Sequence, residues 1–435
     1  MLLGNQTVNA KGHLEIGGCD TIELVKEYGT PLYVMDEEFI RDNAKRYVNS
    51  FKSEYGNAMV AFASKAFIVI AMCKLIAEEG LWLDVASAGE FYTAKCAGFP
   101  MDKILFHGNF KSNEELEMAV KEGVCVVCDS LFEIDNLSKI AKKMNPKDTV
   151  DILIRCNPGV DPHTHSMIST GQEDSKFGVN IKSGKAIEAI TLALSKPNLN
   201  LKGVHIHLGS QLLLIDPFIE VCPIMASFFK AVFDETGKHL EILDIGGGLG
   251  VRYTEDKSVS IEELAKVLSS SLKSAFKEEG LPLPALLIEP GRSITGEAGT
   301  TLYTIGQIKE VNTLEKPFKK YYLPVDGGLS DNPRPSLYGA KYTSLVANKA
   351  NEPKEFTYSI VGRHCESDNL FPDTILQKAE YGDVLAVLTT GAYSHSMASN
   401  YNRFTRPAVV FVKNGKSRIV YRRETLEDLI KCDVK

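Results

Sequence analysis

The strongest constraint on the fold is an alternation of short apolar runs with helix-like segments. The segments between the runs, such as 113–123 and 261–280, have helical apolar spacing and end in glycine. This alternation is typical of a (β/α)8 barrel, although a doubly wound sheet with extra strands would fit the periodicity alone. The eight runs, each with the length of a strand, are 59–64, 82–87, 103–107, 124–129, 151–156, 203–208, 241–246 and 285–290.

The residues at the ends of these runs favour the barrel. Nearly every run ends at or beside a residue that can take part in chemistry, and in a barrel the carboxyl ends of all the strands meet at one mouth. These residues are Lys65, Asp84, His107, Asp129, Arg155, His207, Gly246 and Glu289.

The sequence changes character beyond about residue 295. Short strand-like runs there are separated by turn residues and show little helical spacing, and the first 30 residues look similar. A chain of 435 residues also exceeds one ordinary domain. We therefore expect a (β/α)8 TIM-type barrel over 31–290, and a β-barrel or sandwich domain formed by 1–30 and 291–435.

Composition excludes several classes of partner. A net charge of −7 argues against nucleic acid, and the longest apolar run, 66–73, is far shorter than the ~20 residues of a membrane helix. The first residues contain no apolar signal segment, and the nine scattered cysteines fit a reducing compartment, so we expect a cytoplasmic protein. We expect no metal site at the Cys125–Cys128 pair or at the His163–His165 pair.

The surroundings of Lys65 are unusual for a loop lysine. A lysine after a strand is usually solvated, but its neighbours Ala63, Ser64, Ala66 and Phe67 give no reason for a surface charge. A lysine in an apolar pocket loses proton affinity and can form a Schiff base. The segment FASKAF (62–67) resembles the (F/Y)AxKA motif of the fold-type III pyridoxal-phosphate decarboxylases, which include the ornithine, diaminopimelate and arginine decarboxylases, and in which this lysine carries the cofactor.

Further motifs of the same family follow in the same order, so the resemblance covers essentially the whole chain. They are Asp84 with the VASAGE stretch after it, HGNFKS (107–112), Arg155 in RCNPG, KFG (176–178), GVHIHLGSQ (203–211), GGGLG (246–250), EPGR (289–292), RPSLY (334–338), CES (365–367) and GAY (391–393).

The resemblance implies pyridoxal 5'-phosphate as the cofactor. His207 would stack on its ring, and Glu289 would keep the pyridine nitrogen protonated so that the ring accepts electrons. The glycines of GGGLG follow a strand and would let backbone N–H groups approach the phosphate, although a glycine cluster alone is more often a tight turn. The expected cofactor-binding residues are Lys65, Asp84, Arg155, His207, Ser210, Gly246, Gly247, Gly248, Glu289, Gly291, Arg292 and Tyr393.

Cys365 is a free cysteine of a kind that is usually a small buried hydrophobe. The resemblance makes it the acid that returns a proton to the substrate carbon, so the expected catalytic residues are Lys65, Cys365, Glu289 and His207. The family usually continues CES with Gly-Asp, whereas this chain has Asp368-Asn369.

The substrate is indicated by a different group of residues. Arg292 and Arg334 could bind a second carboxylate of an amino-acid substrate, and Glu366 could bind an ammonium group at its far end. This combination favours decarboxylation of meso-2,6-diaminopimelate to L-lysine and CO2. Ornithine, arginine or carboxynorspermidine remain alternatives, as does a non-catalytic relative that binds another protein. The expected substrate-binding residues are Arg292, Arg334, Tyr338, Glu366 and Tyr393.

The resemblance also implies an assembly. Members of the family build their sites across a homodimer, so we expect Cys365 and Glu366 of one chain to reach the Lys65 of the other.

Overall fold

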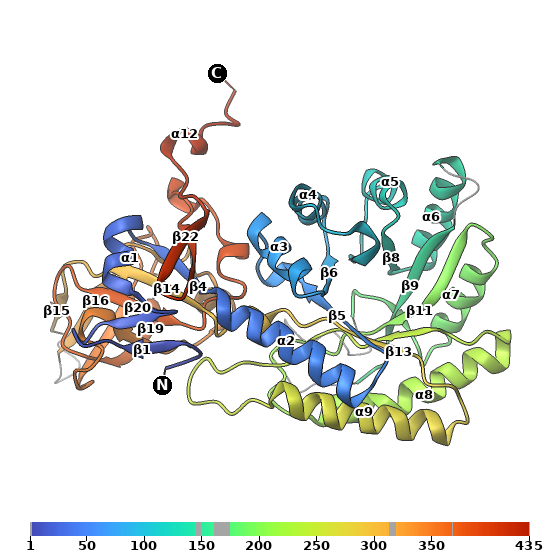
Figure 1. Ribbon diagram of the computed structural model, residues 1–435. Coiled ribbons are helices and arrows are strands. Elements are labelled where there is room, and N and C mark those ends of the chain that lie inside the picture. Colours follow the sequence, from blue (N-terminus) through green and yellow to red (C-terminus); the bar gives the residue numbers. More distant parts are fainter. Residues whose placement is uncertain (1, 145–148, 161–174, 313–318, 368, 435) are drawn as a thin grey trace. The chain divides into compact units, whose positions relative to one another are not determined.

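The computed structural model describes residues 2–144, 149–160, 175–312, 319–367 and 369–434 (Figure 1). His163, His165 and Asp368 therefore lie outside the described residues. The chain divides into two compact units, which are described separately. One comprises Asn43–Gly250 and Lys257–Ser293, and the other comprises Met1–Asp42, Val251–Asp256 and Ile294–Lys435. Within the described residues, no helix has the length and apolar character needed to cross a membrane.

The first unit is a closed barrel of eight parallel strands, which confirms the fold expected from the sequence. Each strand pairs with the next along the chain, and the last, β13, pairs with the first, β5. All eight match the apolar runs of the sequence. They are β5 (Ala58–Ala63), β6 (Trp82–Val85), β7 (Ile104–Phe106), β8 (Cys125–Cys128), β9 (Val150–Asn157), β11 (Leu199–His205), β12 (Ile242–Asp244) and β13 (Ala285–Ile288).

Some helices of this unit begin at a serine that caps them and end at a glycine. Ser112 forms a capping box with Glu115 at the start of α5, and Gly123 ends that helix in the left-handed conformation. Figure 1 shows the helices outside the strands. They are α3 (Ile70–Glu78), α4 (Ala88–Ala97), α5 (Asn113–Glu122), α6 (Leu131–Met144), α7 (Lys185–Leu194), α8 (Asp216–Thr236) and α9 (Ile261–Glu278), with α2 (Glu37–Glu54) entering from the other unit.

Side chains from different strands fill the barrel interior. Ala61, Leu105, Val127, Leu153 and Leu287 form one buried cluster. Because this core is packed, polar residues that follow the strands lie at its end rather than in its middle, which places them at the mouth.

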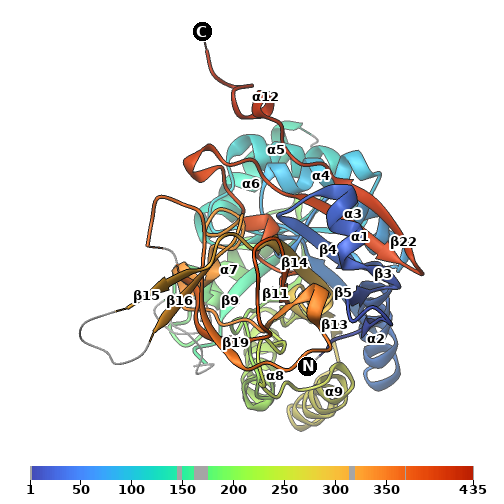
Figure 2. The ribbon, with the colours of Figure 1, turned by 90° about the vertical axis from the view of Figure 1, so that its left-hand side faces the viewer.

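The second unit is built from sheets, which confirms the separate β domain. Its largest sheet has the order β17-β20-β14-β4-β21-β22, with bounds Ser344–Val346, Val384–Leu388, Gly299–Thr304, Leu32–Asp36, Ala408–Lys413 and Lys416–Tyr421. A second sheet joins β15 (Lys309–Val311), β16 (Lys320–Pro324), β18 (Phe356–Val361) and β19 (Asn369–Leu376); β15 and β16 lie side by side in Figure 2. The third contains β1 (Gln6–Val8), β2 (Leu14–Ile16) and β3 (Cys19–Asp20).

Two segments lie in this unit although the sequence analysis assigned them to the barrel range. The strand β4 follows the boundary expected at residue 30, but it pairs with β14 and β21, and all five of its residues are buried. The short segment Val251–Asp256, which follows the glycine loop, also belongs to this unit. Its Tyr253 packs in the same core as Tyr303 and Tyr342. Hydrophobic periodicity marks a strand as buried but does not identify the sheet that buries it, so neither placement was visible in the sequence.

Candidate active site

Lys65 is the first residue of the barrel mouth along the chain. It lies in a short 3-10 helix, Ser64–Ala66, directly after β5. Ser64, Ala66 and Phe67 are buried as the sequence suggested, but the Lys65 side chain itself is exposed. The apolar neighbours therefore support the backbone rather than enclose the amine. Nearby, burial raises the pKa of Asp84, at the end of β6, to about 6.

The glycine loop after β12 leaves no space for side chains. Gly246 has a φ of 68°, and a Cβ atom on Gly247 would lie 2.1 Å from the backbone oxygen of Glu289. The N–H of Gly247 donates to Nδ1 of His207 at 3.4 Å. Desolvation lowers the pKa of His207 well below its usual value, which keeps its imidazole neutral. The glycines are thus required for close approach of β12 and β13 as well as for any approach of a phosphate.

A second group of mouth residues links Ser210 to the segment after β13. Arg292 donates from Nη2 to Oγ of Ser210 at 2.8 Å. Gly291 also lies against the chain near Lys65, because a Cβ atom there would be 3.0 Å from both Cβ and O of Ala63. The structure therefore brings together the residues predicted from the GSQ and EPGR motifs.

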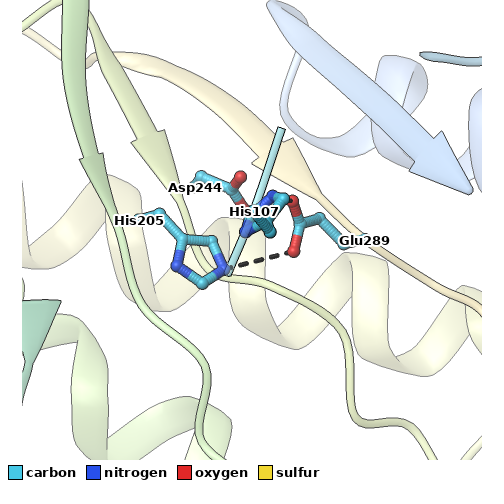
Figure 3. Close-up of side chains that lie close together, drawn as sticks. All are labelled: His107, His205, Asp244 and Glu289. Carbon is cyan, nitrogen blue, oxygen red and sulfur yellow. Dashed lines mark hydrogen bonds and ion pairs between the residues drawn. The ribbon is translucent and has the colours of Figure 1, made fainter. Parts of the chain in front are cut away.

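Glu289 lies in a buried cluster of acids and imidazoles (Figure 3). His107 Nε2 is 2.7 Å from its Oε1, and His205 Nε2 is 3.1 Å from its Oε2. Asp244 completes a set of four residues whose donor atoms lie within 4.8 Å of one another, a group that could hold a metal ion. The expectation of no metal remains a prediction. His107 was expected at the mouth from the sequence but without a role, and His205 and Asp244 were not singled out, although each stands at or next to the end of a barrel strand.

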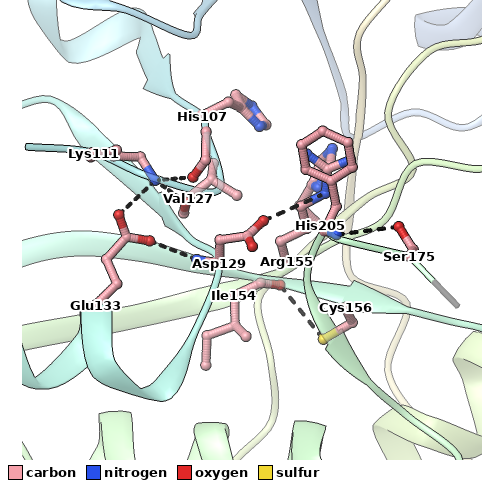
Figure 4. A network of polar contacts seen from close by, with 12 residues as sticks. His107, Lys111, Val127, Asp129, Glu133, Ile154, Arg155, Cys156, Ser175 and His205 are labelled. Carbon is pink, nitrogen blue, oxygen red and sulfur yellow. Dashed lines mark hydrogen bonds and ion pairs between the residues drawn. The ribbon is translucent and has the colours of Figure 1, made fainter. Parts of the chain in front are cut away.

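Arg155 at the end of β9 is placed by a neighbouring polar network (Figure 4). Lys111 donates to the backbone oxygens of Gly108 and Val127 and to Glu133, at 2.8–2.9 Å. Glu133 in turn accepts from the N–H of Asp129. Arg155 lies 4.0 Å from Asp129 and 4.3 Å above the ring of Phe177. This network links the segment after β7 to the end of β8, and it holds Asp129 in place next to Arg155.

In the β unit, the predicted substrate residue Arg334 lies among aromatic rings. Its Nη1 donates to Oη of Tyr253 at 2.6 Å and lies 3.4 Å from Oη of Tyr342. Its guanidinium carbon is 5.9 Å from the ring centres of Tyr338 and of Tyr393. Among the described residues, no carboxylate lies within ion-pair distance of Arg334. Tyr253 and Tyr342 were not found from the sequence, because neither belongs to a motif with an assigned role.

Cys365 and Glu366 lie on an exposed turn of the same unit. The N–H of Cys365 donates to the side chain of Asn402 at 3.0 Å, and Glu366 accepts from the hydroxyl of Tyr401. The preceding His364 is stacked on Tyr401. The turn is thus supported by the 400–402 segment, and its thiol and carboxylate remain open to solvent in the single chain.

The barrel mouth suits a phosphorylated, aromatic cofactor. It offers a bare glycine loop, a hydroxyl paired with an arginine, and a neutral imidazole beside the loop. It also offers a buried carboxylate, Glu289, and a nearby accessible lysine. A phosphate, a ring face and a ring nitrogen would each find a chemically appropriate partner in this set.

Comparisons with known proteins agree with this chemistry. Residues 41–296 match the family of pyridoxal-dependent decarboxylases in its pyridoxal binding domain. The chain is 46% identical to diaminopimelate decarboxylase of Bacillus subtilis (strain 168), with 100% of this chain and 98% of the relative covered. It is also 46% identical to the enzyme of the same name from Halalkalibacterium halodurans, covering 99% and 97%. The crystal structure of diaminopimelate decarboxylase from M. jannaschii with L-lysine superposes with a TM-score of 0.91, at 37% identity over 100% of this chain and 99% of the other.

Proposed function

Because the chain belongs to the diaminopimelate decarboxylases, a family of pyridoxal-dependent decarboxylases, we infer that it converts meso-2,6-diaminopimelate to L-lysine and carbon dioxide. This reaction is the last step of lysine biosynthesis. The observation that carries the conclusion is the agreement along almost the entire chain with relatives of that name. It favours this substrate over ornithine, arginine and carboxynorspermidine, and it favours an enzyme over a non-catalytic relative.

The surroundings of Arg334 support the choice of substrate. A buried guanidinium without a carboxylate partner is costly, so this position favours an incoming anion. The carboxylate at the far end of diaminopimelate provides one. Ornithine has only the carboxylate that is lost in the reaction, and its far end carries an ammonium group alone. Tyr338 and Tyr393 stand near the same guanidinium and would contribute hydroxyl groups. We assign Arg292 to the same carboxylate and Glu366 to the distal ammonium, on the chemistry of their charges.

We assign the cofactor, pyridoxal 5'-phosphate, to the barrel mouth. When bound, it supplies a ring that takes up the electron pair left by the departing carbon dioxide. Lys65 would hold it covalently, and Glu289 would keep a proton on its ring nitrogen. The phosphate would meet the glycine loop. The remaining residues proposed to contact it are Asp84, Arg155, His207, Ser210, Gly246, Gly247, Gly248, Gly291, Arg292 and Tyr393.

The proposed proton donor is Cys365. A thiol can deliver its proton to the substrate carbon that has lost carbon dioxide, and the thiolate that remains regains a proton from solvent before the next turnover. The exposure of Cys365 and Glu366 in the single chain supports a role at an interface. We propose that both residues act in the site of a second copy, in a homodimer with a twofold axis.

The substrate is tested by measuring carbon dioxide release from meso-diaminopimelate, ornithine, arginine and lysine under identical conditions. Only the first should react at a substantial rate. Faster release from ornithine would contradict the assignment of Arg334 to a carboxylate.

The shared site is tested by subunit complementation. Lys65→Ala and Cys365→Ala proteins should each be almost inactive. After they are unfolded and refolded together in equal amounts, half of the dimers should be mixed, and each mixed dimer should have one intact site of two. About a quarter of the parental activity should then return, as the twofold symmetry requires. If mixing restores no activity, Cys365 acts in the active site of its own chain.

A further inference from the structure

The carboxylate of Glu289 is held from both sides by imidazoles that have no role in the site described so far. His107 stands 2.7 Å from one oxygen and His205 stands 3.1 Å from the other (Figure 3). The two rings also contact each other edge to face, with their centres 4.7 Å apart. Glu289, His107 and His205 are 5%, 6% and 1% exposed, so the contacts lie away from bulk water.

The three residues come from separate strands of the barrel. His205 is the last residue of β11, while His107 and Glu289 directly follow β7 and β13. Parallel strands of a closed barrel bring such positions to one layer at the carboxyl end. The contact of each imidazole with Glu289 is therefore set by strand register rather than by a mobile loop.

The neighbouring Asp244 shows what happens to an acid in this layer without such support. Its Oδ1 accepts the N–H of Gly246 at 2.8 Å, but its Oδ2 is buried and has no hydrogen-bond partner among the described residues. Burial, together with the charge of Glu289, raises the pKa of Asp244 well above its usual value. Burial would also raise the pKa of Glu289, but the two imidazoles lower it well below the usual range. These opposite directions favour a negative charge on Glu289 rather than on Asp244.

His205 can provide this support without a charge of its own. Burial lowers the pKa of His205 to about 3, so its ring is neutral at physiological pH. Its Nδ1 is buried without a hydrogen-bond partner among the described residues, which fits a tautomer that carries its proton on Nε2. An Nε2–H group then faces Glu289. Each carboxylate oxygen has a second lone pair, so both remain able to accept from another donor.

We propose that His107 and His205 are positioning residues that hold the two oxygens of Glu289 so that its carboxylate faces the ring nitrogen of pyridoxal phosphate. This inference rests on the proposed function, in which Glu289 pairs with that nitrogen. Without the imidazoles, burial would favour the protonated form of this carboxylate, as it does for Asp244, and a neutral acid would no longer favour a protonated ring nitrogen.

The test compares two ligands of the apoprotein: pyridoxal phosphate and its 1-deaza analogue, in which a carbon atom replaces the ring nitrogen. Their dissociation constants are measured by absorbance titration for the parent and for His205→Leu and His107→Leu. Each leucine variant should bind pyridoxal phosphate about tenfold or more weakly, the effect of losing a close polar contact to a charged group. Binding of the deaza analogue should change less than about twofold, because it makes no contact that depends on the charge of Glu289.

Conservative variants and a control separate positioning from general structural support. His205→Gln keeps a side-chain N–H and should retain most of the affinity for pyridoxal phosphate. His239→Leu, an exposed histidine of the same unit, should affect neither ligand. If a leucine variant does not fold, an asparagine, which is too short to reach Glu289, replaces it. Equal losses for both ligands would show that the histidines only stabilise the fold, and would overturn the inference.

Glu289→Gln distinguishes failure of this inference from failure of the proposed function. If it weakens the binding of pyridoxal phosphate but not of the deaza analogue, Glu289 does meet the ring nitrogen. Histidine variants without such selectivity would then refute the positioning role alone. If Glu289→Gln shows no selectivity either, the assignment of Glu289 to the ring nitrogen is wrong, and the positioning role falls with it.

Discussion

Glu289 at the barrel mouth and Arg334 in the β unit are charged groups buried in different ways. At the barrel mouth, Glu289 is 5% exposed and meets two imidazoles, and the buried Lys111 meets Glu133. In the β unit, Arg334 is equally buried, at 6%, yet it faces tyrosines and no carboxylate among the described residues.

This difference separates two kinds of binding site. A charge that is compensated inside the protein can be held at a fixed position, which suits a permanently bound cofactor. A charge that lacks a counter-ion gains most when a charged ligand arrives, which suits a substrate that comes and goes. We therefore expect that a change at Glu289 affects the cofactor and the chemistry, whereas a change at Arg334 itself affects substrate affinity.

The largest effect is expected for Lys65→Ala. Loss of the only amine proposed to hold the cofactor covalently should abolish nearly all turnover and the visible absorbance of the bound cofactor. Lys121→Ala, at an exposed lysine of α5, serves as the control and should behave like the parent. A coloured and active Lys65→Ala protein would place the covalent link on another lysine.

The next largest effect is expected for Glu289→Gln. The fold and the covalently held cofactor should persist, but decarboxylation should slow at least about tenfold, because an amide cannot provide the charge that the ring nitrogen needs. Single-turnover measurements of carbon dioxide release isolate this step. Unchanged rates would remove Glu289 from the chemistry.

Arg334→Met tests the uncompensated charge of the β unit. Its kcat/KM for meso-diaminopimelate should fall by more than about tenfold, since a charge-assisted hydrogen bond contributes about 1.5–3 kcal/mol. Cofactor absorbance should not change. If the variant loses its cofactor instead, Arg334 contributes to cofactor binding, and the assignment of its charge to the substrate alone is wrong.

A smaller effect is expected for Tyr253→Phe. The change removes the hydroxyl that accepts from Arg334 at 2.6 Å, so KM should rise a few-fold while kcat changes little. Tyr342→Phe is the matched control, because its hydroxyl is 3.4 Å from the same nitrogen and should contribute less. Equal effects of the two variants would indicate a general change in packing rather than orientation of the guanidinium.

The last prediction concerns stability rather than activity, at a buried acid of the β unit that accepts from neutral donors. Burial raises the pKa of Asp331 to about 7, while Tyr303 and the N–H of Gly328 donate to it. Between its unfolded pKa, about 3.9, and this value, the folded state binds more protons than the unfolded state. The protonated Asp331 carboxyl therefore makes its full contribution to the free energy of unfolding below about pH 4. This contribution is lost as the pH rises to about 7 and the carboxyl ionises.

Asp331→Asn cannot titrate, so the difference in melting temperature between variant and parent should move in favour of the variant over that range. The underlying slope is at most about 1.4 kcal/mol per pH unit. Thermal unfolding at several pH values measures it. A constant difference across the range would mean that Asp331 does not titrate there.

The barrel strands, the separate β domain and the family could all be predicted from the sequence. Apolar runs of strand length report burial directly, and short motifs such as FASKAF and GVHIHLGSQ keep their spacing because each lies within one strand and its following loop. The fold and the family were confirmed for this reason. The assignments of individual residues to cofactor and substrate remain predictions that the experiments above can test.

Only the tertiary structure decided which residues surround Glu289 and Arg334. His107, His205 and Asp244 are far apart along the chain and become neighbours of Glu289 because the closed barrel brings the ends of its strands to one mouth, including β7 and β11, which do not pair with β13. Tyr253 follows the glycine loop of the barrel, yet it packs in the β unit against Arg334. The physical reason is the same in both cases. Local pattern records whether a side chain is buried, whereas its partner depends on which distant segment the sheet brings beside it.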